Sequence, residues 1–174
     1  MNHISALLIT LLVLDSGAVR ADDPCATAFR WDVATERALF AGAAEALVAG
    51  RASASAPTVH DGHAYAIALA SQPDVRFAVP PARTRVEGAY AGLVTADISE
   101  AGRYRISLDV PAWIDVVVAG TALAAADFQG GHGCSAPHKI VEFNLPAGNA
   151  LVQLSASAVG TLRFSLTRSP RTGD

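Results

Sequence analysis

The side chains best suited to metal or acid–base chemistry in this chain are histidines. Four of them lie beyond the first 21 residues: His60, His63, His132 and His138. Two of these with Glu142 would have the composition of a nonhaem metal site. Their spacing matches neither the HExxH helix motif nor an HxH…E pattern. We therefore predict no metal and no cofactor, and a small, dioxygenase-like metal-dependent enzyme using these residues remains the alternative.

A second group of residues is typical of a binding face. Trp113 and Asp115 share one face of a predicted strand, and a ring beside a carboxylate can stack on a sugar and accept its hydroxyls. The competing interpretation is that Trp113 is a core residue at the start of a strand. The glycine-rich segment 124–137 follows this strand and lets backbone approach a ligand. We predict a ligand cleft there that gathers six residues: Trp113, Asp115, Gln129, His132, His138 and Lys139.

The stretch 102–123 is expected to organise the fold as a β-hairpin. Apolar residues at 104, 106, 108 and 110 alternate with polar ones, and a period of two places the two sets on opposite sheet faces. Pro111 interrupts the run because it has no N–H to donate. Residues 113–118 form the predicted second strand, favoured by the β-branched run at 116–118 and followed by a turn at Ala119-Gly120. The outward-pointing residues are expected to be Arg103, Arg105, Ser107 and Asp109.

Further short strands are predicted along the chain, over 29–33, 65–69, 75–79, 93–98, 141–145, 151–155 and 162–166. Strands at intervals of roughly 8–12 residues, separated by Pro, Gly and Asn turns, indicate a mainly β fold. Residues 36–49 fit a helix with Thr35 as N-cap and Gly50 as C-cap, or a strand through 38–41. The predicted architecture is an antiparallel, jelly-roll-like β-sandwich with one short N-terminal helix as an option.

The first 21 residues resemble an export signal. The apolar run Ile4–Leu14 is too short to span a bilayer, and Val19 and Ala21 are small residues at the positions preceding a cut. We predict cleavage after Ala21, an uncleaved anchor or plain helix being the alternatives. Removing 21 of the 174 residues leaves 153, which we interpret as a single β-sandwich domain over 22–174, periplasmic or secreted, with no transmembrane segment.

Two cysteines remain in the mature chain. In an oxidising compartment they most simply form one disulfide between Cys25 and Cys134. The alternative makes Cys134 a thiolate nucleophile beside His132 or His138. The formal net charge of −3 offers no electrostatic case for nucleic acid as a partner.

Residues 92–155 resemble the PA14-type and pre-peptidase C-terminal modules of secreted bacterial proteins. The similarity rests on Glu-Ala-Gly-Arg-Tyr at 100–104, a strand–turn–strand, and VEFNLPAG at 141–148, with Ala119-Gly120 where PA14-type turns usually have Asp-Gly. The resemblance implies a β-sandwich with a carbohydrate-binding or accessory role. We assign no binding residues from it. We therefore predict a non-catalytic binding or accessory domain of the bacterial cell envelope, with a glycan or envelope protein as partner. A structural periplasmic assembly protein is a further alternative, and the oligomeric state is not predicted.

Overall fold

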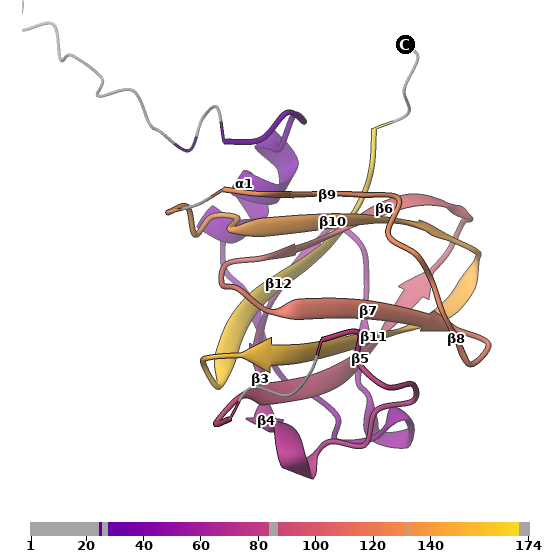
Figure 1. Ribbon diagram of the computed structural model, residues 1–174. Coiled ribbons are helices and arrows are strands. Elements are labelled where there is room, and N and C mark those ends of the chain that lie inside the picture. The colour runs from indigo at the N-terminus through magenta and orange to yellow at the C-terminus, as the bar shows by residue number, and fades with distance from the viewer. Residues whose placement is uncertain (1–24, 26–27, 84–86, 132, 171–174) are drawn as a thin grey trace, which may run out of the picture.

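The computed structural model describes residues 25, 28–83, 87–131 and 133–170 (Figure 1). The predicted signal peptide and its cleavage site lie outside these residues. The helices that the structure describes are all too short to cross a membrane.

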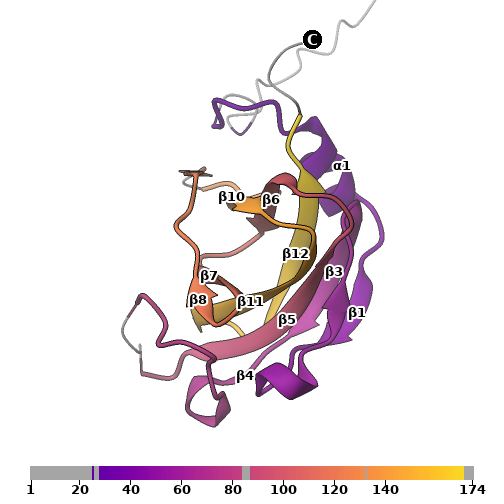
Figure 2. The same cartoon turned by 90° about the vertical axis from the view of Figure 1, so that its right-hand side faces the viewer.

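Two β-sheets face each other and curve around a common interior (Figure 2). The first sheet has the order β1 (Glu45–Val48), β3 (His63–Ala68), β12 (Thr161–Arg168), β6 (Gly102–Leu108), β10 (Lys139–Leu145) and β9 (Asp127–Gly130). The second has the order β2 (Thr58–Val59), β5 (Tyr90–Ile98), β11 (Gly148–Ser157), β7 (Trp113–Val118) and β8 (Thr121–Ala122), with β4 (Ala70–Ser71) also paired to β5. The remaining elements are α1 (Ala34–Ala41) and the 3₁₀ turns η1 (Ser53–Ser55) and η2 (Gln72–Asp74). The predicted mainly β sandwich is confirmed, although β1–β3 and β2–β5 are parallel pairs.

The predicted hairpin over 102–123 is wrong, because its two strands belong to different sheets. Strand β6 pairs with β10 and β12, whereas β7 pairs with β11 and β8. The Asp109 carboxylate accepts a hydrogen bond from the Arg163 backbone N–H at 2.8 Å, which ties the end of β6 to β12 rather than to β7. The chain then crosses to the second sheet through Pro111. The turn at Ala119-Gly120 is confirmed, and both residues have positive φ.

This crossing brings the apolar faces of β6 and β7 to opposite sides of one core. Inward-facing residues alternate along each long strand, as the period of two requires. The contributions from β6, β7, β10 and β12 are Tyr104, Ile106, Leu108, Ile114, Val116, Val141, Phe143, Leu145, Leu162, Phe164 and Leu166. Burial of this set is the main favourable contribution to folding.

Three local predictions also need correction. Residues 29–33 form bends instead of a strand and pack as a small cluster of Phe29, Val33 and Ile140. Residues 36–49 hold both a helix and a strand, because α1 ends at Ala41 and β1 follows. The N-cap of α1 is Val33, not Thr35, and its C-cap is Gly42, not Gly50. Residues 75–79 are irregular and cross the outer face of the second sheet. There the buried Gln153 side chain forms hydrogen bonds with the backbone of Ala78 and Val79.

The outer face of the first sheet carries a buried ion network. Arg105 is 6% exposed, and its guanidinium lies 3.2 Å from Glu142 Oε1 and 3.4 Å from Glu36 Oε1. It also donates to the Asp32 backbone carbonyl at 2.8 Å and lies under the Trp31 ring, 4.7 Å from its centroid. Arg105 therefore points away from the core as predicted, but the segment before α1 and α1 itself cover it.

Each carboxylate of this network has further donors. Thr167 Oγ1 donates to Glu36 at 2.9 Å, and Ser169 Oγ donates to Glu142 at 2.6 Å. Arg103 Nη1 lies 3.3 Å from the other oxygen of Glu142. Buried charges are tolerated only with this degree of pairing. The network thus joins α1 to β6, β10 and β12.

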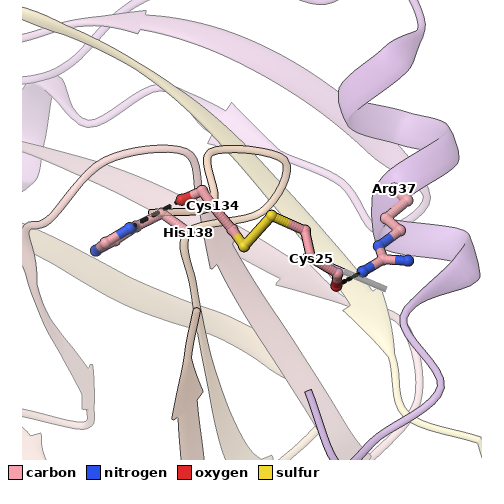
Figure 3. The surroundings of a disulfide bond; sticks show 4 residues. All are labelled: Cys25, Arg37, Cys134 and His138. Atoms are coloured by element: carbon pink, nitrogen blue, oxygen red, sulfur yellow. Dashed lines mark hydrogen bonds between the residues drawn. A yellow bond between two sulfur atoms is a disulfide. The ribbon is translucent and has the colours of Figure 1, made fainter. Parts of the chain in front are cut away.

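A disulfide between Cys25 and Cys134 fastens the same N-terminal segment at a second point, as predicted (Figure 3). It joins residues 109 positions apart, and cross-linking a loop of that length stabilises a fold by roughly 4–5 kcal/mol in the chain-entropy model. The Arg37 guanidinium of α1 donates to the Cys25 carbonyl, so helix and disulfide are also in contact.

Removing Arg105 should be costly because it leaves two buried carboxylates facing each other. We expect Arg105→Met to lower the free energy of unfolding by about 3–5 kcal/mol, measured by urea denaturation. Arg30→Met is the matched control, because Arg30 pairs with Asp127 at the surface with 73% of its side chain exposed. Its loss should cost less than about 1 kcal/mol. Equal unfolding midpoints for the two variants would show that the network does not stabilise the fold.

Candidate functional site

A cavity of about 360 Å³ lies where the β6–β7 crossing meets the start of β10. Its lining comes from segments far apart in the sequence: Arg83, Pro111, Ala112, Trp113, His138, Lys139 and Ala156. We call it the end cavity. It brings together three of the residues predicted to bind a ligand, Trp113, His138 and Lys139.

The Trp113 ring is held in place by Asp115. The indole Nε1–H donates to Asp115 Oδ1 at 2.9 Å, and the other carboxylate oxygen accepts the Ala82 N–H at 3.2 Å. Asp115 therefore connects the outer side of β7 to the segment that crosses this sheet, and Arg83 is the next residue of that segment. The Arg83 guanidinium carbon lies 5.1 Å from the centroid of the Trp113 ring.

Lys139 approaches the same ring. It is the first residue of β10, and its ammonium nitrogen lies 5.0 Å from the Trp113 centroid while donating to the Ala112 carbonyl at 3.0 Å. Burial lowers the pKa of Lys139 below its usual 10.5, the positive charge of Arg83 lowers it further, and Asp115 acts in the opposite direction. The cavity thus holds two cations that destabilise one another.

His138 contributes a hydrogen-bonding group with a defined orientation. Its Nδ1 lies 3.0 Å from the Cys134 carbonyl (Figure 3). Because a carbonyl can only accept, Nδ1 carries the hydrogen, and in the neutral ring Nε2 is then an acceptor. The disulfide at Cys134 therefore positions this imidazole through one intervening hydrogen bond.

A bulge in β11 shapes another part of the lining. The register of β11 against β5 shifts between Leu154 and Ser157, and Ala156 has a φ of 55°. A positive φ is unfavourable for alanine. The buried Gln72 side chain stabilises this conformation by accepting the Ala156 N–H at 2.7 Å.

The remaining predicted residues lie elsewhere. Gln129 is buried, does not line the end cavity, and accepts a 2.6 Å hydrogen bond from the Arg30 backbone. His132 lies outside the described residues. Glu142 belongs to the ion network, His60 Nδ1 is 3.5 Å from Asp97, and the described part of the chain contains no group of three or more metal-ligating side chains.

Sequence reasoning missed Arg83 and Ala156 as parts of this cavity. Arg83 belongs to an irregular segment whose course depends on hydrogen bonds to the side chains of Gln153 and Asp115, and no local pattern encodes these. The bulge at Ala156 interrupts an otherwise regular strand without a glycine or proline to mark it.

Comparison with family models, curated proteins and solved structures found no match to this chain.

The charges around Lys139 generate a prediction that a single NMR signal can test. Lys139 is the only lysine in the sequence, so labelling lysine with ¹³C at Cε reports this residue alone. We expect a pKa below 10.5, raised by Arg83→Gln and lowered further by Asp115→Asn. Arg51→Gln, an exposed arginine outside the cavity, is the control. A wild-type value at or above that of a free lysine would contradict the described environment.

Proposed function

We propose that this protein is an exported binding or accessory domain of the bacterial cell envelope, with no catalytic role, and that its ligand occupies the end cavity. A carbohydrate is the first candidate. The observation that carries the proposal is the gathering of Trp113, His138 and Lys139 around one cavity of about 360 Å³. Ligand sites have volumes of roughly 300–1,000 Å³ and combine apolar surface with a few polar groups.

The polar groups of the cavity suit a hydroxylated ligand. Nε2 of neutral His138 can accept a hydroxyl hydrogen, and the Lys139 ammonium can donate to a hydroxyl or ring oxygen. The indole supplies a flat apolar surface whose orientation Asp115 holds through the Nε1–H. Asp115 and the Cys134 carbonyl hold the indole and the imidazole in defined orientations, which limits the entropic cost of binding.

Export is supported by the disulfide. Disulfides persist in oxidising compartments and are rare in the cytosol. The predicted signal peptide would direct the chain to such an oxidising compartment. A periplasmic or secreted location is therefore part of the proposal.

The proposal can be tested with the mature protein, residues 22–174, and a panel of soluble cell-envelope oligosaccharides that includes peptidoglycan fragments. The chain has two tryptophans, so Trp31→Phe leaves the emission of Trp113 as a direct report on the cavity. We expect at least one glycan to change this emission saturably. In the otherwise wild-type chain, Trp113→Ala should weaken binding of that glycan at least tenfold, or about 1.4 kcal/mol.

Trp113→Phe is the matched control for the fluorescence, because the remaining Trp31 lies against Arg105 and away from the cavity. Its emission should not respond to the glycan. A panel in which nothing binds, or in which binding survives Trp113→Ala unchanged, would contradict the proposal.

A further inference from the structure

The end cavity has an excess of positive charge. Arg83 and Lys139 both border it, and within the described residues neither forms an ion pair. Asp115 is the acidic group that acts on Lys139, but its two oxygens accept hydrogen bonds from the Trp113 indole and the Ala82 backbone. The charge of the two cations is therefore not matched by a carboxylate in direct contact.

Both cations also lie close to the indole ring of Trp113. Each lies about 5 Å from the ring centroid, a distance typical of cation–π contact. A neutral sugar beside Trp113 would leave the charges of these two groups uncompensated. An anionic group that contacts both cations would instead remove their mutual repulsion.

We propose that the ligand of the end cavity is a glycan carrying an anionic group, a carboxylate or a phosphate, which Arg83 and Lys139 bind together beside Trp113. This inference rests on the proposed function and specifies its ligand class. The arginine fork can make two parallel hydrogen bonds to such a group, and Lys139 adds a point charge oriented by the Ala112 carbonyl. His138 is left for the sugar hydroxyls.

The two halves of the ligand can be tested separately by calorimetry on the mature protein. The probes are a trimer of galacturonic acid, its fully methyl-esterified form, and inorganic phosphate. The acid and its ester share one sugar framework and differ in charge, so their comparison isolates the anion. Cε-labelled Lys139, the only lysine of the chain, shows by NMR whether each probe reaches this site.

We expect the acid to bind at least tenfold more tightly than the ester and to shift the Lys139 signal. Lys139→Met and Arg83→Gln should each reduce its affinity at least tenfold, while Arg51→Gln, the exposed arginine outside the cavity, should leave it unchanged. Raising the salt concentration should weaken binding of the acid but not binding of the ester.

Each failure has a different meaning. If the ester binds through Trp113 as tightly as the acid, and the Lys139 and Arg83 variants bind normally, the anionic ligand is refuted and the glycan-binding function stands. If phosphate shifts the Lys139 signal and neither trimer binds, the anion site is supported and the glycan function is contradicted. If no probe shifts that signal, the inference is overturned.

Discussion

The pairing of Arg105 with two buried carboxylates is the interaction on which the rest of the structure depends. A guanidinium that is 6% exposed must be compensated, and the compensation comes from Glu142 on the neighbouring strand and Glu36 on α1. The carboxylate of Glu36 can reach Arg105 only if α1 lies on the outer face of the first sheet. The network therefore specifies where the N-terminal segment packs, which apolar contacts alone would specify less precisely.

Strand β10 transmits this arrangement to the end cavity. Its outward-facing residues Ile140 and Glu142 lie under the N-terminal segment, while Val141 and Phe143 face the core. Lys139 begins the same strand and borders the cavity. The disulfide provides a second connection, because it ties residue 25 to the loop that leads into His138. Two cross-links of different chemistry thus hold the N-terminal segment against the strand and loop that carry two cavity residues.

Much of the strand content could be predicted because period-two alternation is a local property. It placed strands within β3, β5, β6, β7, β10, β11 and β12, and cysteine count was enough to pair Cys25 with Cys134. The pairing of strands is not local. Alternation in β6 and β7 is the same whether they form a hairpin or cross between sheets, and the choice depends on contacts such as Asp109 with the Arg163 backbone.

The site was predicted only in part for the same reason. Trp113, His138 and Lys139 could be grouped because they follow one another around the β6–β7 crossing and the loop before β10. Arg83 could not, since its segment has the alternation of a strand but is held across the outer face of the second sheet by polar side chains. Arg105 has the same limitation: a charged residue on the polar face of a strand is expected in solvent, unless another element supplies its partners.

Hydrogen–deuterium exchange in α1 tests most directly whether the ion network holds the N-terminal segment in place. The comparison is between wild type and Arg105→Met, both with the disulfide intact, under conditions where the two remain folded. If the network holds α1, exchange in residues 34–41 should accelerate strongly in the variant, while the core strands β5 and β11 remain protected. Equal protection of α1 in both proteins would contradict this role of the network. It would show that packing and the disulfide are enough to hold α1 in place.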